Sequence, residues 1–224
     1  MSLLPVSSEL NKIAKAIIRS KGRGILVGGA VRDHFMDRRI SKDLDVEVFG
    51  LSMEELESVL KQFGNIYAVG KSFGVLKLKT TTAEYDFSLP RREQKTGKGH
   101  RGFKIITDPA MSFKEAASRR DFTVNSIGYD LLENTLLDPF EGIEDIKNKK
   151  LRHIGPAFAE DPLRVYRAMQ FSARLEFNIS AQTAKFCRKL ELSELPRERI
   201  FEEFRKLLLK AKKPSIGLKN AKQI

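Results

Sequence analysis

The chain has 224 residues, 41% of them hydrophobic and 31% charged, so it can bury a core as one large domain or two small ones. No apolar run approaches the ~20 residues of a membrane span, the N-terminus has no signal-peptide pattern, and the single cysteine, Cys187, excludes an internal disulfide. We therefore expect a cytoplasmic protein. The 41 Lys and Arg against 29 Asp and Glu give a net charge of +12, which favours a polyanionic partner over a merely soluble basic surface.

Hydrophobic periodicity up to about residue 150 predicts helices mixed with strands. Helices are predicted over 7–19, from about 30, over 52–63 and from 112, and strands over 25–27, 43–49, 66–69, 75–79 and 84–89. The polar, basic and glycine-containing segment 90–102 predicts a loop. A turn at 133–134 between two apolar runs predicts a hairpin.

Beyond about residue 151 the pattern is helical and shows no strand signal. Helices are predicted over 161–175, 181–190 and 197–210, followed by a solvated, lysine-rich end. We therefore expect an α+β fold in two domains, with a sheet and helices in 1–150 and an all-helical domain in 151–224.

Acidic and apolar residues alternate along two of the predicted strands. Asp43 and Asp45 are two residues apart and point to the same face, and Asp86 lies on a second alternating strand. If these strands are neighbours, three carboxylates can hold Mg²⁺, a hard cation that takes oxygen ligands and serves phosphate chemistry. The alternative is an ordinary solvent-facing side of a strand.

A glycine pair joins the predicted strand 25–27 to a helix. Gly28 and Gly29 would let a phosphate approach the backbone at the start of the helix, and Arg32 would add a guanidinium fork. The pattern is neither a P-loop nor a dinucleotide-binding fingerprint. The alternative is a tight turn that needs glycine.

Five motifs follow one another along the chain: 28–33 with 42–47, 119–126, 138–152, 160–167 and 197–208. Together they resemble the class II tRNA nucleotidyltransferases, a family of the DNA polymerase β-like superfamily that comprises CCA-adding enzymes and bacterial poly(A) polymerases. The resemblance covers about residues 22–210 and implies a nucleotidyltransferase head over 1–150 and a helical, nucleobase-binding neck over 151–224. Family members usually carry further body and tail domains, so a head-and-neck fragment and a naturally short form both stay open.

The resemblance also implies a role for each matching residue. Asp43, Asp45 and Asp86 would be catalytic and would bind two Mg²⁺ ions during catalysis. The triphosphate would be held by Gly28, Gly29 and Arg32. The sugar and phosphates would be bordered by Arg120, Asp121 and Asn125, although Asp121 alone also fits the N-cap of a helix over 122–129.

Asp161 and Arg164 are three residues apart on a predicted helix, which places them on one face. Their acceptors and donors match the Watson–Crick edge of cytosine or adenine, each of which presents an exocyclic amine beside a ring-nitrogen acceptor. Arg167, one turn further on, is a plausible third contact. The alternative is a surface ion pair within one helix.

The resemblance predicts an enzyme that adds CMP and AMP from CTP and ATP to the tRNA 3′ end without a nucleic-acid template. The basic segment 91–104 matches a segment that CC-only enzymes typically lack, so it favours full CCA addition. The alternatives are a poly(A) polymerase, a CC-only or A-only enzyme, or, from another class, a non-catalytic RNA-binding module. The sequence does not determine the oligomeric state.

Overall fold

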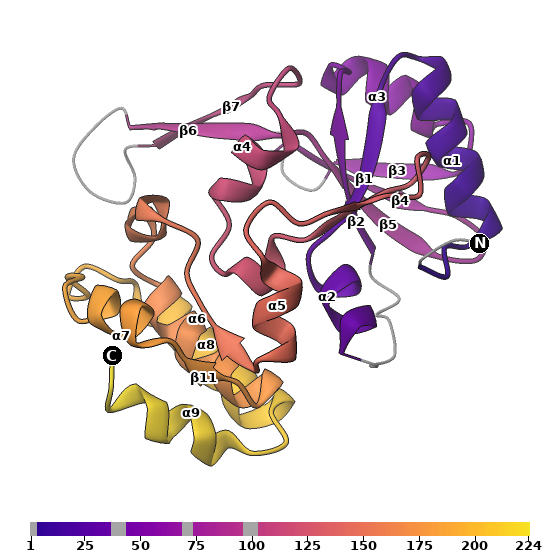
Figure 1. The fold of residues 1–224 in the computed structure, drawn as a ribbon. Coiled ribbons are helices and arrows are strands. Elements are labelled where there is room, and N and C mark those ends of the chain that lie inside the picture. Colours follow the sequence, from indigo (N-terminus) through magenta and orange to yellow (C-terminus); the bar gives the residue numbers. More distant parts are fainter. Residues whose placement is uncertain (1–3, 37–43, 69–73, 96–102) are drawn as a thin grey trace. The chain divides into compact units, whose positions relative to one another are not determined.

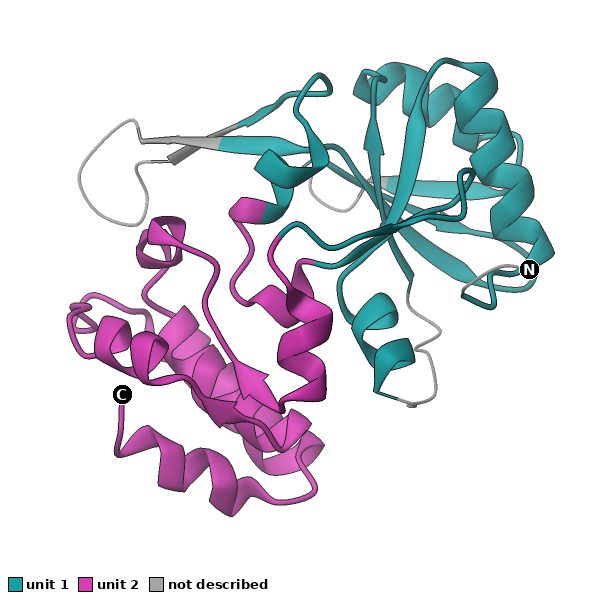
Figure 2. Ribbon diagram, viewed as in Figure 1, with its two compact units in different colours: residues 1–117, 127–139 teal, residues 118–126, 140–224 magenta. Residues whose placement is uncertain are grey.

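The computed structural model describes residues 4–36, 44–68, 74–95 and 103–224, and its helices and strands are labelled in Figure 1. The chain divides into two compact units, shown in Figure 2. Unit 1 comprises residues 1–117 and 127–139, and unit 2 comprises residues 118–126 and 140–224.

Unit 1 is built on a seven-stranded mixed sheet with the strand order β3–β4–β5–β2–β1–β8–β9. These strands are β1 Arg23–Val27, β2 Leu44–Phe49, β3 Asn65–Ala68, β4 Val75–Lys79, β5 Glu84–Ser88, β8 Gly128–Asp130 and β9 Leu136–Leu137. β2 and β5 pair in parallel, and the other neighbours pair antiparallel. The predicted hairpin is the β8–β9 pair.

Four helices accompany the sheet of unit 1: α1 Ser8–Arg19, α2 Gly29–Phe35, α3 Met53–Leu60 and α4 Phe113–Ser118. The Ser7 hydroxyl caps α1 by accepting a hydrogen bond from the Leu10 amide, and a capping box starts α3. α1 packs against β1 and α3 (Figure 1). Its apolar stripe therefore covers one face of the sheet.

Alternation along β2 decides which side chains reach solvent. Val46 and Val48 are fully buried, and a Cβ on Gly24 would touch both Val46 and Ile17 of α1, so these valines face the helix. On the opposite face exposure increases toward the start of β2: Phe49 and Glu47 are buried, whereas Asp45 is exposed. The sheet thus presents Asp45 to solvent at the start of β2, whereas Phe49 at its other end belongs to an apolar cluster that also contains Ala116 of α4.

The segment after residue 90 is not the loop that its polarity predicts. β6 (Arg91–Lys95) pairs antiparallel with β7 (Phe103–Thr107), while residues 96–102 lie outside the described part of the chain. β6 has no apolar residue, so periodicity could not reveal it. Its strand conformation comes from backbone pairing with β7.

Unit 2 is mainly helical. Its elements are η1 Thr123–Asn125, α5 Gly142–Lys147, β10 Lys150–Leu151, η2 Pro156–Glu160, α6 Arg164–Leu175, β11 Asn178–Ile179, α7 Ala181–Cys187, α8 Arg197–Lys210 and α9 Pro214–Ala221. α6 packs against α8 and α9 around Met169, Ala173 and Leu207. Two expectations are wrong here: β11 pairs in parallel with β10, and α9 stands where a solvated end was expected.

Residues 118–126 belong to unit 2 because their contacts lie there. The Thr123 amide donates to the Arg152 carbonyl at 3.0 Å, and Phe122 forms a bridge with His153 and packs edge-on against Phe158. The expected helix over 122–129 is wrong, because η1 gives way to β8. The compact units therefore do not divide at residue 150, and the head and neck boundary stays a prediction about domains.

Candidate functional site

Unit 1 brings two of the predicted metal-binding carboxylates together. Asp45 on β2 and Asp86 on β5 are direct partners in the parallel register, so the condition that their strands be neighbours is met. Asp45 is exposed and the Asp86 side chain is 34% exposed. Asp43, the third predicted ligand, lies outside the described residues.

The chemistry of this pair fits a hard divalent cation. Carboxylates at paired positions project to one face of the sheet and repel each other unless a positive charge compensates them. Their oxygens are the ligand type that Mg²⁺ prefers. In the described ranges, which do not include Asp43, no group of three or more His, Cys, Asp and Glu converges on a metal position.

The glycine turn precedes α2 as predicted. Gly28 has a φ of 74°, a conformation that favours glycine, and stands at the N-cap of this seven-residue helix. Arg32 is 3% exposed, and its Nε and Nη2 donate to Asp33 Oδ1 at 2.9 and 2.7 Å. The structure therefore places the Arg32 guanidinium inside the unit beside Asp33.

Unit 2 joins two of the predicted nucleotide-binding motifs through an ion pair between buried Asp121 and half-buried Arg167. Arg167 Nε and Nη2 donate to Asp121 Oδ2 at 2.9 and 2.6 Å. Asp121 Oδ1 accepts from the Phe122 amide at 2.8 Å and from Asn125 Nδ2 at 3.0 Å. Burial alone would raise the pKa of Asp121, but the Arg167 charge and these hydrogen bonds hold that pKa below its ordinary value.

Asp161 is not on the helix that carries Arg164, so the premise that they share a helix face is wrong. Asp161 has an extended backbone, with φ −128° and ψ 97°, and α6 begins only at Arg164. Pro162 explains this, because a residue before proline is disfavoured in the α conformation. Asp161 Oδ1 instead accepts from the Leu163 amide at 3.2 Å.

Contacts within unit 2 hold both members of this predicted base-reading pair. Arg164 Nη1 donates to the Ala157 carbonyl at 2.7 Å, and Nη2 donates to the Arg119 carbonyl at 2.6 Å. Arg199 on α8 pairs with Asp161 Oδ2 at 2.9 Å. The Arg164 amide donates to the Asp161 carbonyl at 3.0 Å, while the two side chains are held by other residues of unit 2.

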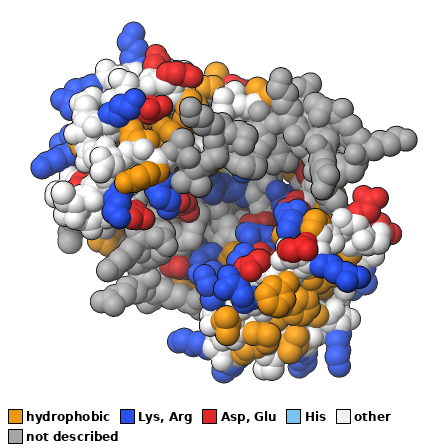
Figure 3. Space-filling model, turned by 180° about the vertical axis from the view of Figure 1, so that it is seen from behind, with side chains coloured by type: hydrophobic (Ala, Val, Ile, Leu, Met, Phe, Trp, Pro, Cys, Tyr) orange, Lys and Arg blue, Asp and Glu red, His pale blue; other side chains and the backbone are white. Residues whose placement is uncertain are grey.

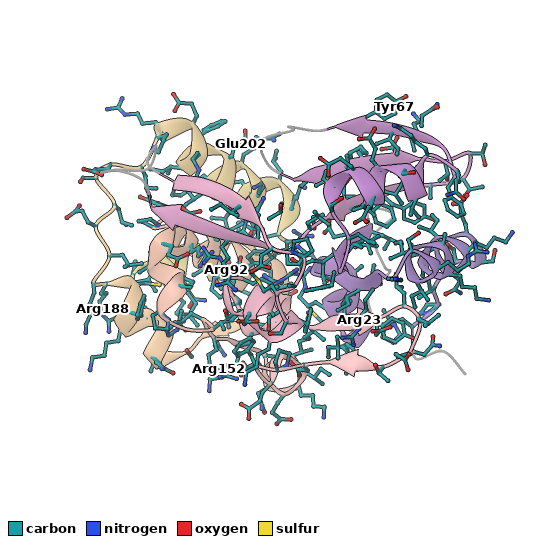
Figure 4. The ribbon with its side chains drawn as sticks, turned by 90° about the horizontal axis from the view of Figure 1, so that it is seen from above. Arg23, Tyr67, Arg92, Arg152, Arg188 and Glu202 are labelled. Atoms are coloured by element: carbon teal, nitrogen blue, oxygen red, sulfur yellow. The ribbon has the colours of Figure 1, made fainter. Side chains whose placement is uncertain are left out.

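Sequence reasoning missed several residues that support these positions. Asp145, 5% exposed, accepts from Thr123 Oγ1 at 2.6 Å and from Arg152 Nε at 2.8 Å, which ties α5 to η1 (Arg152 is labelled in Figure 4). Buried Glu203 lies 4.0 Å from Arg167. Arg120, by contrast, is a site residue that the sequence predicted, and its Nη1 donates to the Asn125 carbonyl at 3.4 Å. The motif over 138–152, which contains Asp145, could be recognised in the sequence, but its spacing did not indicate which residues Asp145 contacts.

Lys and Arg side chains, which give the chain its net charge of +12, are scattered among acidic and apolar side chains on the face seen in Figure 3. Within the described ranges, no helix has the length and apolar character needed to cross a bilayer.

Comparison with known proteins gave two family matches. A family described as the poly(A) polymerase head domain matches residues 25–152, and one described as the probable RNA and SrmB-binding site of polymerase A matches residues 176–223. A multifunctional CCA protein of Stenotrophomonas maltophilia is 42% identical over 201 residues, which are 87% of this chain and 47% of that protein. The chain thus spans about half the length of the curated relatives it matches.

Solved structures share the fold. A tRNA nucleotidyltransferase complexed with a primer tRNA and an incoming ATP analog is 29% identical, with a TM-score of 0.78 over 94% of this chain and 60% of that one. The Bacillus stearothermophilus CCA-adding enzyme in complex with CTP is 28% identical, with a TM-score of 0.74 over 92% and 49%. The predicted fold class, a polymerase β-like head with a mixed sheet, is therefore confirmed.

Proposed function

Because the chain belongs to the poly(A) polymerase head-domain family, as its motifs predicted, we propose that it is a tRNA nucleotidyltransferase. It adds CMP and AMP from CTP and ATP to the tRNA 3′ end in the cytoplasm, with no membrane partner. The observation that carries the proposal is the pairing of Asp45 with Asp86 on neighbouring strands of unit 1. The names of the relatives support the choice of tRNA as substrate.

Asp45 and Asp86, with Asp43, would hold the metal. Nucleotidyltransferases of this family generally depend on a metal, and two Mg²⁺ ions would lower the pKa of the attacking 3′-hydroxyl and neutralise charge on the triphosphate. The 3′-oxygen attacks the α-phosphorus, and pyrophosphate leaves. The exposure of Asp45 on an otherwise buried strand supports this role, because a ligand can reach it.

The glycine turn would receive the triphosphate. A Cβ at Gly29 would lie 3.5 Å from Arg32 Nη2, so the guanidinium is directly beside the turn. Arg32, paired with Asp33, would contribute a fixed positive charge behind the turn.

Unit 2 would read the sugar and the base. Asp121, paired with Arg167, also holds Asn125, and with Arg120 these side chains would border the ribose and phosphates. Arg164 is held by two carbonyls and keeps further N–H donors for a ring-nitrogen acceptor, while Asp161 would accept from the exocyclic amine. Guanine and uracil present the opposite order of donors and acceptors, so this pair would reject them.

A poly(A) polymerase is the second candidate, because both matching families carry that description. Primer extension with Mg²⁺ separates the two. The substrates are tRNAs ending at the discriminator base, after C and after CC, each with CTP, ATP, GTP or UTP alone and then with all four. Addition of CCA followed by arrest is expected. Long A tracts mean a poly(A) polymerase, and arrest after CC means a CC-adding enzyme.

Two variants test the site itself. Asp45→Asn should abolish incorporation while leaving the circular dichroism spectrum unchanged, because an amide is a poor metal ligand and Asp45 is not part of the core. Glu57→Gln on α3, which removes another acid of unit 1 that pairs with Lys61, is the matched control and should retain activity. Normal turnover by Asp45→Asn would contradict the metal assignment. If the unsubstituted chain neither incorporates nor binds CTP and ATP, the non-catalytic RNA-binding module is favoured.

A further inference from the structure

Lys77 lies in the same row of the sheet as the two described carboxylates. The register pairs Lys77 on β4 with Asp86 on β5, and it pairs Asp86 with Asp45 on β2. Directly paired positions on neighbouring strands project to the same face. The face that carries the proposed metal site therefore also carries a lysine.

The Lys77 ammonium already contacts one of these carboxylates. Its Nζ lies 2.9 Å from Asp86 Oδ1, and each side chain is 34% exposed. Oδ1 itself is closed to solvent and accepts no hydrogen bond from the described residues, so charge attraction holds the pair. Partly exposed ion pairs of this kind stabilise weakly, which means that the ammonium can be displaced.

A positive charge at this position has a physical reason. Two ionised carboxylates that face each other across neighbouring strands destabilise the sheet when no cation accompanies them. Lys77 supplies that charge from the strand on the other side of Asp86. The same ammonium repels any divalent cation that approaches Asp86, because both are positively charged. The ammonium and the cation also compete for the same carboxylate oxygens.

We propose that Lys77 is a positioning residue that compensates the Asp45–Asp86 pair before a metal arrives and weakens the binding of divalent cations there. This inference rests on the proposed function, since it takes the pair as the metal site. Metal binding then includes displacement of the ammonium from Asp86. Lys77 thereby stabilises the positions of the two carboxylates and lowers their affinity for metal.

Titration of the full chain with Mn²⁺, followed by the electron paramagnetic resonance of the free ion, measures this affinity without turnover. Lys77→Met keeps an unbranched side chain but removes the charge, and we expect it to bind Mn²⁺ about three- to tenfold more tightly. Lys77→Arg keeps the charge and should stay near the unsubstituted chain. Lys61→Met removes an exposed lysine of α3 that pairs with Glu57 at 2.7 Å, so it controls for net charge.

Thermal unfolding gives a second readout. In EDTA, Lys77→Met should unfold at a lower temperature than Lys61→Met, and saturating Mg²⁺ should raise its Tm by more. Equal Mn²⁺ affinity in Lys77→Met and Lys61→Met would overturn the inference and leave the metal site standing. If Asp45→Asn binds Mn²⁺ as well as the unsubstituted chain, the metal site is elsewhere, and the inference fails with that part of the proposed function.

Discussion

Replacing Arg167 with methionine should destabilise the protein by about 2–3 kcal/mol at pH 7. The change removes the only charged group that the structure shows bonded to Asp121, whose side chain is 7% exposed. Breaking a buried ion pair by removing one partner costs about 3–5 kcal/mol. The loss expected for Arg167 is smaller than this general range because Asp121 keeps the Phe122 amide and Asn125 as donors, and because Arg167 is itself 32% exposed.

The loss should depend on pH in a defined direction. The folded-state pKa of Asp121 is below its ordinary value of 3.8, so the stability from its ionised form is fully present above about pH 4 and is lost as pH falls through the lower folded pKa. Without Arg167, burial raises the pKa of Asp121, and protonation then relieves the unpaired charge. The difference between the two proteins should therefore shrink between pH 7 and pH 4.

Urea unfolding followed by circular dichroism at 222 nm, at pH 7, 5 and 4, measures both effects. Arg205→Met, which breaks an exposed pair with Glu202 on α8, is the matched control and should change little. Adding Asp121→Asn to the Arg167 variant should restore part of the stability, because a neutral amide needs no counter-ion. A loss below about 0.5 kcal/mol at pH 7, or one that stays constant in acid, would refute the reasoning.

Two further predictions concern the packing of unit 2. Gly217→Ala should lower the free energy of unfolding by about 1–3 kcal/mol, measured by thermal denaturation, because a Cβ there would lie 2.6 Å from the Met169 carbonyl and from Leu207 Cδ1; an unchanged Tm would show that α9 does not pack on α6 in this way. Burial raises the pKa of Cys187 to about 11, so the native thiol should react with Ellman's reagent at pH 8 far more slowly than the urea-unfolded chain. Equal rates would contradict its burial.

Which side chains of β2 and β5 face the core could be predicted from the sequence, because the alternation of side chains along a strand is a local property. Tyr85 and Phe87 are buried while Glu84 and Asp86 face outward, as their period of two indicates. The pairing of Asp45 with Asp86 is different, because the register depends on how β2 and β5 meet across about forty intervening residues. The sequence pattern indicates that a metal site requires β2 and β5 to be neighbours, and only the structure shows that they are.

The errors have equally specific causes. The Asp161–Pro162 sequence already disfavours a helix at Asp161, but the apolar periodicity of the following residues outweighed that signal. α9 holds Gly217 within eight residues and follows a run of lysines, so its composition indicated a frayed end. That glycine packs closely on Leu207 and Met169, and packing between helices stabilises a helix without showing in a local sequence pattern.

Asp121 of unit 2 and the Asp45–Asp86 pair of unit 1 have opposite surroundings, and this contrast separates a residue that positions others from residues that bind a ligand. In unit 2, both oxygens of Asp121 are occupied by donors of the same unit, so its carboxylate can orient Arg167 and Asn125 but has little capacity left for a ligand. In unit 1, Asp45 is exposed and Asp86 is compensated by a lysine that a metal can displace. Substitutions at Asp121 should therefore change stability and nucleotide affinity together, whereas substitutions at Asp45 should remove metal binding and leave the fold intact.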